Sequence, residues 1–421
     1  SVMAEGGINA ALNTKDENDS PEEHFTDTIK AACGLADPNA VWGMTQAAPE
    51  LVHWLLKLGV KFNMSGYDDV DLRNFGGQKK KRTAFAQSDT GKQIMTAMID
   101  AVRRKEASGM VERFSHHSFL TLRLCGNICC GCVIRDEYSQ ETVELPGDAV
   151  IVATGGMHGL FGNTTGSLSN TGEVTAELFR LGVPLANGEM IQYHPTTVKC
   201  GGKRMLISEA ARGEGGRLFA MKDGKQWYFM EEKYPELGNL MPRDITAREI
   251  WKVSHESEVF LDMTEISEEI ISNKLSGLAD DCMTYLHKDI RKEPVSVLPG
   301  IHYFMGGILV DEQHRTPIQN LCAAGECCAQ YHGANRLGGN SLLGALYGGR
   351  VAAKSACEQA DVVDLSCATQ IDFPPASQIS EIKQLNKVMQ ETMGVVRNEN
   401  TLLNGIQTVQ ALTGNLPPLR N

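Results

Sequence analysis

The sequence has no surplus of positive charge and no long apolar run. Its 421 residues contain 40 Lys and Arg against 52 Asp and Glu, which gives a formal net charge of −12. A nucleic-acid-binding surface needs excess cations to displace the counterions of phosphate, so nucleic acid is not expected as a partner. No stretch approaches about 18 consecutive uncharged apolar residues, so no membrane-spanning helix is expected. The composition indicates an acidic globular protein, long enough for about three domains.

The sequence does not contain two C-x-x-C pairs, the spacing that zinc and iron–sulfur sites commonly show. Residues 124–135 contain four of the twelve, in a segment whose alternation of Ile and Cys is typical of one strand: Cys125, Cys129, Cys130 and Cys132. We therefore expect buried, reduced cysteines and no metal site. Unpaired spacing in a chain of this size also indicates a reducing, cytosolic compartment.

The one basic run is Lys79-Lys80-Lys81-Arg82. Charge runs of this length are usually solvated, so we interpret it as an exposed loop and not as a localisation signal or an anion-binding patch.

Capping signals predict three helices in the first quarter of the chain. Ser20-Pro21, Asp37-Pro38 and Ser88-Asp89 each precede an apolar pattern of helical period. After a change in composition near residue 360, apolar stripes at 382–396 and 402–409 predict two more helices.

Many of the 42 glycines occur in pairs beside apolar runs, where backbone turns sharply or approaches a ligand. The apolar run Ala149–Ala153 leads directly into Thr154-Gly155-Gly156. This pattern predicts a buried strand that ends in a glycine turn, which is how α/β proteins place backbone amides against a cofactor.

Polar side chains are concentrated beside glycines or prolines in five segments: 192–196, 208–215, 242–244, 302–307 and 332–343. Together they contain several histidines and arginines. Such a set suits a small dianion, because Arg binds a carboxylate through two hydrogen bonds and a neutral His donates one more. Taken singly, each His is more often structural and each Arg more often part of a surface ion pair.

The chain resembles the flavoprotein subunits of the succinate dehydrogenase/fumarate reductase family, to which L-aspartate oxidase is related. The matching segments follow one another in order and cover essentially the whole chain: SVMAEGGINA at 1–10, ATGG at 153–156, QYHPT at 192–196, SEAARGEGG at 208–216, PRD at 242–244, HYFMGG at 302–307 and HGANRLGGNSLL at 332–343. HGANRLGGNSLL together with HYFMGG is highly specific.

The resemblance implies an α/β fold with a Rossmann-like, glutathione-reductase-type FAD-binding domain in two pieces, residues 1–187 and 300–360. An α+β capping domain at 188–299 would be inserted between them, and part of a helical domain would follow at 361–421. The sequence does not begin with a strand and a G-x-G-x-x-G turn, so we expect that the βαβ beginning of the FAD domain is missing from it. The attachment histidine of covalent relatives would also precede Ser1, which leaves open whether FAD is covalently bound.

By resemblance, FAD would contact residues from six segments of the chain. Glu326 would bind the ribityl hydroxyls, and backbone amides around Ser341-Leu342 would stabilise the reduced flavin. The contact residues are Ser1, Val2, Met3, Ala4, Glu5, Gly6, Gly7, Ala153, Thr154, Gly155, Glu173, Tyr303, Glu326, Asn340, Ser341 and Leu342. Two of them depart from the family pattern: Glu5 replaces a common glutamine, and Gly172-Glu173-Val174 replaces Gly-Asp-Gly.

The implied substrate is a four-carbon dicarboxylate, fumarate or succinate, held by His194, Ser208, His302 and Arg336 and covered by Phe75. In the fumarate direction, flavin N5 would deliver a hydride while Arg243 delivers a proton. Glu209 and Arg212 would restore that proton, and their spacing puts both on one face if the segment is helical.

Electrons would be exchanged with an iron–sulfur subunit and through it with a membrane anchor. The chain would then work in the cytoplasm, or peripherally on the inner face of the membrane. Two alternatives remain open. L-aspartate oxidase is favoured by Pro242–Ile245 followed by Ala247-Arg248 and disfavoured by Arg336–Asn340. A non-catalytic electron-carrier flavoprotein is disfavoured by the joint presence of five polar residues: His194, Glu209, Arg243, His302 and Arg336.

Overall fold

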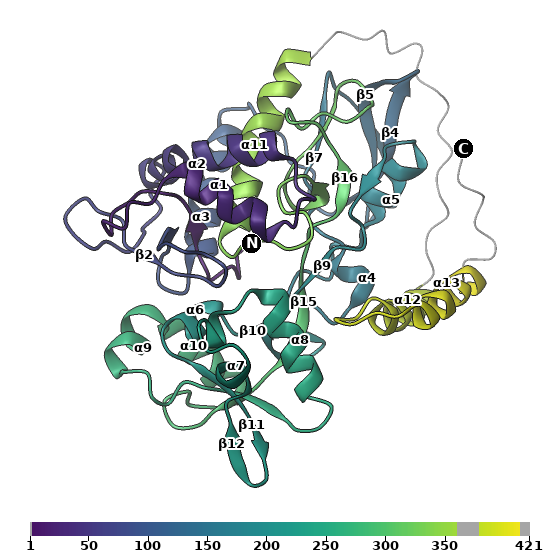
Figure 1. Ribbon diagram of the computed structural model, residues 1–421. Helices are drawn as coiled ribbons and strands as arrows, with labels where there is room; N and C mark the ends of the chain where they lie inside the picture. The colour runs from purple at the N-terminus through teal and green to yellow at the C-terminus, as the bar shows by residue number, and fades with distance from the viewer. Residues whose placement is uncertain (1, 360–378, 413–421) are drawn as a thin grey trace.

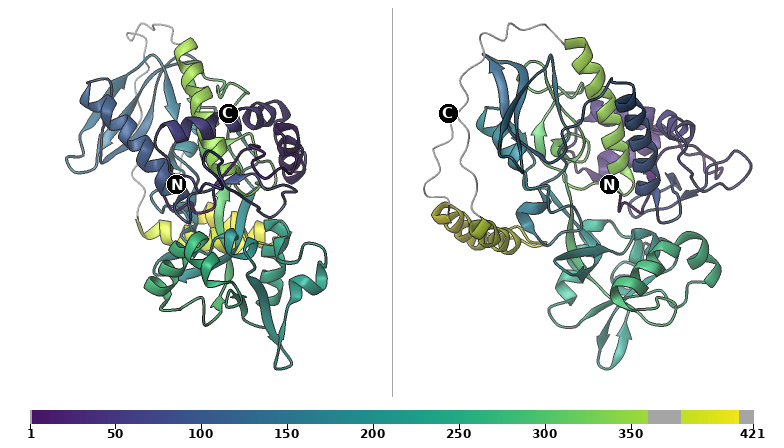
Figure 2. Two further views of the ribbon diagram at one scale, coloured as in Figure 1. Left: turned by 90° about the vertical axis from the view of Figure 1, so that its left-hand side faces the viewer. Right: turned by 180° about the vertical axis from the view of Figure 1, so that it is seen from behind.

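Two antiparallel strands, β9 (Ile191–Cys200) and β15 (Leu298–Phe304), run between two bodies of the molecule (Figure 1). The computed structural model describes residues 2–359 and 379–412. One body contains the N-terminal helices, and the other is formed by the residues between the two strands. The further views in Figure 2 show the same division.

The first body begins with the helices that the capping signals predicted. In α1 (Pro21–Ala31), Ser20 Oγ accepts a hydrogen bond from the Glu23 amide, and in α2 (Pro38–Lys57) the Asp37 carboxylate accepts from two amides. Helix α3 (Thr90–Ala107) begins after Asp89 without a side-chain cap. All three predicted helices are thus confirmed. Helix α11 (Asn340–Gln359) packs on α2 around a shared apolar core.

The sheets of this body are small. The three-stranded sheets are β1-β3-β2, β4-β5-β6 and β18-β16-β8. Their bounds are β1 Ile8–Asn9, β2 Leu72–Arg73, β3 Thr83–Ala84, β4 His117–Cys125, β5 Ile128–Asp136, β6 Thr142–Pro146, β8 Leu185–Ala186, β16 Gly307–Leu309 and β18 Cys328–Ala329. The short helices α4 (His158–Phe161) and α5 (Glu173–Arg180) precede β8 in the chain.

A parallel pair, β7 (Val150–Val152) and β17 (Leu321–Ala323), determines where the glycine turns lie. Both strands end at the same edge, so the ATGG turn and the 3-10 turn Gly325–Cys327 follow side by side. The prediction of a fully buried strand at 149–153 is wrong in part, because Ile151 is 41% exposed. Within the described residues β7 pairs with β17 alone, which leaves its other edge uncovered.

The cysteines of β5 do not alternate between a buried and an exposed face. Cys129 and Cys130 are adjacent and both buried, and the register between β4 and β5 shifts at this point, which interrupts the regular alternation of side chains. Cys129, Cys130 and Cys132 carry free thiols, as expected. Cys125, at the end of β4, is disulfide-bonded, so the expectation of a reduced thiol is wrong at this position.

The second body has its own apolar core, built from side chains between Met205 and Val297 together with Phe75. Its four-stranded sheet has the order β12-β11-β13-β14, and β10 adds to β9. The strands are β10 Lys203–Leu206, β11 Arg217–Lys222, β12 Lys225–Trp227, β13 Val259–Asp262 and β14 Val295–Ser296. The helices are α6 Glu209–Gly213, α7 Phe229–Lys233, α8 Arg243–Val253, α9 Glu268–Lys274 and α10 Ser276–Asp281, with a 3-10 turn at Gly238–Leu240 and a π-helical turn at Cys282–Leu286. The boundaries proposed for a capping domain, 188–299, stay a prediction.

The two apolar stripes after residue 378 form α12 (Ile379–Thr392) and α13 (Glu399–Leu412), which pack on each other. The two predicted helices are therefore confirmed. Helix α12 also contacts α4, where Asn386 Nδ2 donates to Gly159 O over 2.6 Å. The rest of the segment proposed as a helical domain, 361–378 and 413–421, lies outside the described residues. None of the helices in the described parts of the chain is long and apolar enough to cross a membrane.

The basic run at 79–82 is not entirely solvated, which corrects the sequence-based interpretation. Arg82 is fully buried and donates to Asp19 over 2.8 and 3.1 Å, and its Nη1 lies 3.0 Å from Asp27 Oδ2. Two acidic side chains from the segment around α1 thus enclose the last cation of the run. Lys81 remains half exposed and lies 3.6 Å from Glu17.

Arg82→Met is expected to destabilise the protein by about 3–5 kcal/mol, because it leaves Asp19 and Asp27 buried without their common partner. Lys81→Met, one residue away, removes only an exposed ion pair and is expected to cost less than about 1 kcal/mol. Urea unfolding of both variants measures the difference. Equal losses in the two variants would contradict a structural role for the buried cluster.

Candidate functional site

Two histidines come together where β9 pairs with β15. His194 lies opposite Gly300, and the register shifts between Ile301 and Tyr303, so His302 lies in an irregularity of the strand. Such a bulge changes the direction of a side chain. The imidazole rings are 5.2 Å apart with their planes at 68°. His194 is buried, and its Nδ1 lies 3.3 Å from the Thr196 amide, which can donate to it.

Helix α6 carries the next two groups. Ser208 is its N-cap and accepts a hydrogen bond from the Ala210 amide, which leaves the hydroxyl hydrogen free to be donated elsewhere. Glu209 and Arg212 lie three residues apart on one face, with 3.4 Å between Arg212 Nη2 and Glu209 Oε1. The expectation that the two share a helical face is confirmed. The Gly76 amide also donates to Glu209 Oε1 over 3.2 Å.

Arg243 is the first residue of α8 and is only 7% exposed, so it is not part of a surface pair. Its Nε and Nη2 donate to Glu209 Oε2 over 2.8 and 2.6 Å. Its Nη1 donates to Gln192 Oε1 over 3.1 Å. A single carboxylate therefore lies between two arginines, and Arg243, Glu209 and Arg212 form a continuous chain that we call the relay.

A third arginine, Arg336, comes from the loop before α11. It is 2% exposed, its guanidinium carbon lies 4.5 Å from the ring centre of Tyr303, and its Nη1 makes one long hydrogen bond of 3.4 Å to Leu337 O. Its Nε has no hydrogen-bond partner. Burial, with the nearby Arg243 adding to it, lowers the pKa of Arg336 to about 9. A buried cation with an unpaired N–H group needs an anion, so the site is built to receive one.

Burial sets the protonation of the other groups. It lowers the pKa of His194 and of His302 well below the usual range, and Arg243 lowers both further, so both rings are neutral at pH 7. Burial alone would raise the pKa of Glu209, but Arg243 and Arg212 together lower it, which keeps the carboxylate ionised. Three buried arginines thus face one buried carboxylate, an excess of two positive charges.

Phe75 lies beside the relay in the apolar core of the second body and is 3% exposed. A side chain at Gly6 or Gly338 would meet its ring, since an added Cβ would lie 2.9 Å and 3.0 Å away. The adjacent Gly76 contacts Glu209. Phe75 therefore lies between the Gly6 segment and the relay, a position compatible with its predicted role as a cover.

At the edge shared by β7 and β17, the turns that follow the two strands expose backbone groups. Ala153 and Thr154 are exposed there, and Gly155 has a φ of +75°, which favours glycine. Glu326 follows β17, and its Oε1 accepts from the Phe304 amide over 3.1 Å and lies 3.0 Å from His158 Nε2. This arrangement leaves Oε2 for a ligand hydroxyl.

The remaining residues predicted to contact FAD come from other segments of the chain. Val2 and Met3 are exposed and Ala4 and Gly6 half-buried, whereas Gly7 is buried with a φ of +128°. Glu173 is exposed at the first position of α5. Ser341 and Leu342 lie in the first turn of α11, where backbone amides have no helical partner. Ser1 lies outside the described residues.

The Asn340 side chain contacts three neighbouring side chains. Its Oδ1 accepts from Asn9 Nδ2 over 2.8 Å and lies 2.9 Å from His24 Nε2, while its Nδ2 donates to Thr28 over 3.0 Å. Its amide donates to Leu337 O. Asn340 therefore positions the start of α11, and its contact with FAD stays a prediction.

Three polar residues in contact with these groups were not nominated from the sequence. Gln192 lies two residues before His194, holds Arg243, and donates from Nε2 to Arg336 O over 2.8 Å. His158 pairs with Glu326, and His332 is buried with an unpaired Nδ1, its ring 5.3 Å from that of Tyr303. The one feature of the sequence that could have identified these three residues is their proximity to the motifs that carry the predicted site residues.

Glu5 is buried against other acidic groups. Its Oε2 has no hydrogen-bond partner. Burial, with Asp281 adding to it, raises the pKa of Glu5 from 4.5 to about 8, although Arg73 opposes the shift. A carboxyl whose folded-state pKa is raised stabilises the fold below its unfolded pKa, and that contribution is lost as pH rises through the folded value.

Glu5→Gln is accordingly expected to raise the melting temperature at about pH 8.5, by roughly 2–5 °C, and to leave it nearly unchanged at about pH 5. Differential scanning calorimetry across that range gives the comparison. Glu112→Gln, at an exposed position, is the control and should shift neither value. A Glu5→Gln curve parallel to that of the parent protein would refute the buried, protonated state.

The residues present fit a flavin adenine dinucleotide. The parallel pair β7/β17 offers an exposed glycine turn, α11 offers unpaired amides at its start, and Glu326 offers a carboxylate oxygen. His332 Nδ1 is a further buried polar atom without a hydrogen-bond partner in the protein. These groups would hold the polar parts of the cofactor.

Comparisons with known proteins agree with this geometry. The family described as FAD binding domain matches residues 1–342. The chain is 39% identical to the succinate dehydrogenase flavoprotein subunit of Bacillus subtilis, over 100% of this chain and 73% of the relative. It is 32% identical to the L-aspartate oxidase of Nostoc sp., over 98% and 72%. An E. coli quinol fumarate reductase FrdA variant superposes with a TM-score of 0.89 at 27% identity, over 98% of this chain and 75% of that one.

Proposed function

The chain belongs to the FAD-binding family of succinate dehydrogenase and fumarate reductase flavoprotein subunits, and we propose that it interconverts fumarate and succinate. It is an oxidoreductase with FAD as its cofactor. One observation carries the choice of substrate: three buried arginines face one carboxylate, and Arg336 Nε is unpaired. A dicarboxylate dianion neutralises that excess and supplies the missing acceptors.

Substrate binding is assigned to residues from four separate segments. Arg336 would bind one carboxylate, and the neutral rings of His194 and His302 would each donate a hydrogen bond. Ser208 has its hydroxyl hydrogen available because its oxygen already accepts an amide. Phe75 would exclude water from one side. Contacts that twist one carboxylate out of the plane of the double bond raise the electrophilicity of that bond, so binding energy would act at the reacting carbon.

When bound, FAD supplies the hydride chemistry that no side chain can perform. The chain itself must then provide one proton to the neighbouring carbon for each fumarate reduced. We assign this proton to Arg243, which the bonds to Glu209 and Gln192 hold in a fixed orientation. An arginine with a usual pKa above about 12 is a weak acid, so it can protonate only a strongly basic carbanion. Glu209 returns a proton to Arg243, and Arg212 returns one to Glu209.

Electrons are proposed to pass to or from a partner subunit that carries iron–sulfur clusters. The relative from Bacillus subtilis, and others from Wolinella succinogenes and Methanothermobacter marburgensis, are named as subunits. We propose that this chain likewise works as a subunit, in the cytoplasm or on the inner face of the membrane through its partners.

The test is an assay of the purified, FAD-loaded protein with both substrate pairs. With fumarate as oxidant, the protein is expected to oxidise a reduced viologen dye and to form succinate. Consumption of oxygen with L-aspartate and formation of peroxide, without the viologen reaction, would instead establish the oxidase activity named for the Nostoc relative. Activity in neither assay, with FAD bound, would indicate an electron carrier and contradict the proposal.

A further inference from the structure

The loop that follows α4 contacts His302, one of the two histidines assigned to the substrate. Thr165 Oγ1 lies 2.8 Å from His302 Nδ1. The Thr165 amide donates to Ile301 O over 3.0 Å, and Thr164 Oγ1 donates to the same oxygen over 3.0 Å. Thr165 belongs to none of the motifs that contain the predicted site residues. Its hydroxyl is nevertheless in direct contact with one of those residues.

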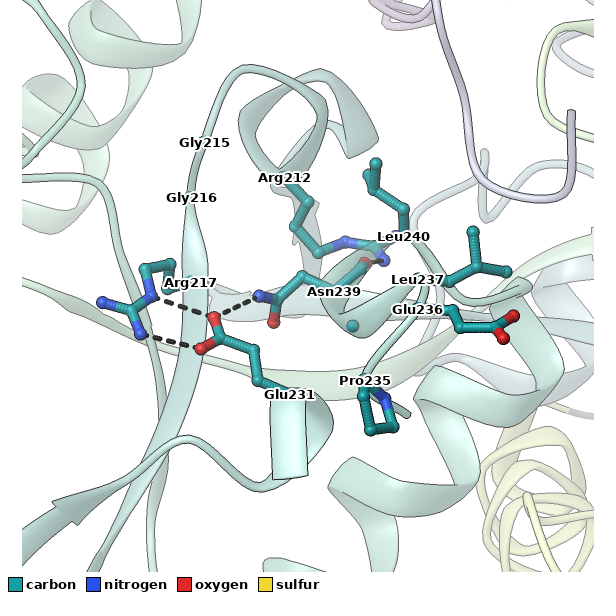
Figure 3. A pocket seen from close by; sticks show the side chains of 11 residues that line it. Arg212, Gly215, Gly216, Arg217, Glu231, Pro235, Glu236, Leu237, Asn239 and Leu240 are labelled. Carbon is teal, nitrogen blue, oxygen red and sulfur yellow. Dashed lines mark hydrogen bonds and ion pairs between the residues drawn. The ribbon is translucent and has the colours of Figure 1, made fainter. Parts of the chain in front are cut away.

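The direction of the hydrogen bond between Thr165 and His302 decides what His302 can offer a ligand, because a hydroxyl and an imidazole nitrogen can each donate or accept. Around the pocket in Figure 3 the directions are unambiguous, since the carboxylate of Glu231 can only accept from Arg217 and Asn239. For Thr165 the direction follows from the other acceptors that its hydroxyl hydrogen could reach.

Ile301 O is the one other acceptor for the Thr165 hydroxyl among the described residues, and it lies 3.5 Å away. A carbonyl oxygen has two lone pairs. Both are already engaged at 3.0 Å, one by Thr164 Oγ1 and one by the Thr165 amide. The hydroxyl therefore donates to His302 Nδ1, at a normal hydrogen-bond length.

An acceptor at Nδ1 determines the tautomer of His302. Burial, with Arg243 and Arg336 adding to it, lowers the pKa of His302 well below its usual range, so the ring is neutral and has one N–H group. Because Nδ1 accepts from Thr165, that group is Nε2–H. Nε2 makes no hydrogen bond to any residue in the described parts of the chain, and His302 is only half-buried. This N–H group is therefore available to a ligand.

We propose that Thr165 is a positioning residue that holds His302 in its Nε2–H tautomer and so makes the ring a hydrogen-bond donor to a substrate carboxylate. The inference rests on the proposed function. Without the hydroxyl, the Nδ1–H tautomer becomes accessible. Its Nε2 lone pair would face the carboxylate and repel it, so part of the binding energy would be lost.

The test compares two substitutions of Thr165 in the full, FAD-loaded chain. Thr165→Val removes the hydroxyl at nearly constant volume, and Thr165→Ser retains it. Isothermal titration calorimetry with succinate is expected to show about tenfold weaker binding for Thr165→Val and binding within about threefold of the parent protein for Thr165→Ser. Thr408→Val is the matched control, because Thr408 is an exposed residue of α13 whose hydroxyl donates to Asn404 O; it should leave the affinity unchanged.

Nitrogen NMR of protein labelled with ¹⁵N-histidine supplies a readout that a merely structural role would not change. In the ligand-free parent protein, His302 is expected to carry its proton on Nε2, and Thr165→Val is expected to populate the opposite tautomer. The signals are assigned by their loss in His302→Gln. A proton on Nδ1 in the parent protein, or equal succinate affinity of Thr165→Val and the parent protein, would overturn the proposal. If the parent protein does not bind succinate, the proposed function fails, and that result is distinct because the tautomer is measured without ligand.

Discussion

Arg243→Lys is expected to lower the turnover number for fumarate by about 10³-fold while FAD remains bound. Lysine keeps the positive charge but has one nitrogen atom in place of the planar fork. Arg243 uses that fork to make two hydrogen bonds to Glu209 and one to Gln192, and it approaches the substrate position from this fixed orientation. Steady-state kinetics with reduced viologen, together with flavin absorbance for cofactor content, would measure the effect.

The matched control is Arg248→Lys, one helical turn further along α8. Arg248 is 48% exposed on its side chain and pairs with Asp244 over 3.2 Å, so its substitution should leave turnover within about twofold. Comparison of the two variants distinguishes the specific effect of losing Arg243 from a general effect of substituting an arginine in α8. Turnover of Arg243→Lys within a few-fold of the parent protein would show that Arg243 is not the proton donor.

Glu209→Gln is expected to lower steady-state turnover by about 10²–10³-fold, because the amide cannot accept and return a proton. It also removes the one carboxylate between Arg243 and Arg212, so some loss of stability is expected as well. The relay predicts a specific pattern. The first turnover of the reduced protein should be slowed less than the later ones, and Glu209→Asp should recover part of the activity.

Glu214→Gln controls for the removal of a carboxylate near the end of α6. Glu214 pairs with Lys274 over 2.9 Å and makes no contact with Arg243, so its substitution should not alter turnover by more than about twofold. Thermal unfolding of both variants would show how much of the loss is structural. Equal slowing of first and later turnovers in Glu209→Gln would assign the residue to positioning and not to proton transfer.

Local signals in the sequence were sufficient for the parts of the fold that depend on neighbouring residues. Helices α1 and α2 begin where Ser20 and Asp37 predict, because an N-cap bonds to amides two or three residues away. The shared face of Glu209 and Arg212 follows in the same way from a spacing of three. These predictions require no knowledge of tertiary structure.

Local signals could not predict which side chains are buried or which residues from distant segments contact them. Arg82 was interpreted as solvated because its neighbours are lysines, yet its partner Asp19 lies 63 residues earlier in the chain. Exposure of Ile151 likewise depends on which segments pack on the face of β7. Arg243 is buried against a carboxylate 34 residues away in the chain. The identity of the site residues came from motif resemblance, and Gln192 was passed over because its role depends on contacts with two other segments.

The central claim is that a buried site with two excess positive charges receives a dicarboxylate dianion. Isothermal titration calorimetry of the FAD-loaded protein with succinate, and separately with its monomethyl ester, tests this claim most directly. Succinate is expected to bind once per chain and at least about tenfold more tightly than the ester, because the ester leaves one positive charge of the site unmatched. Equal affinity for the two ligands, or no binding of succinate, would contradict the account.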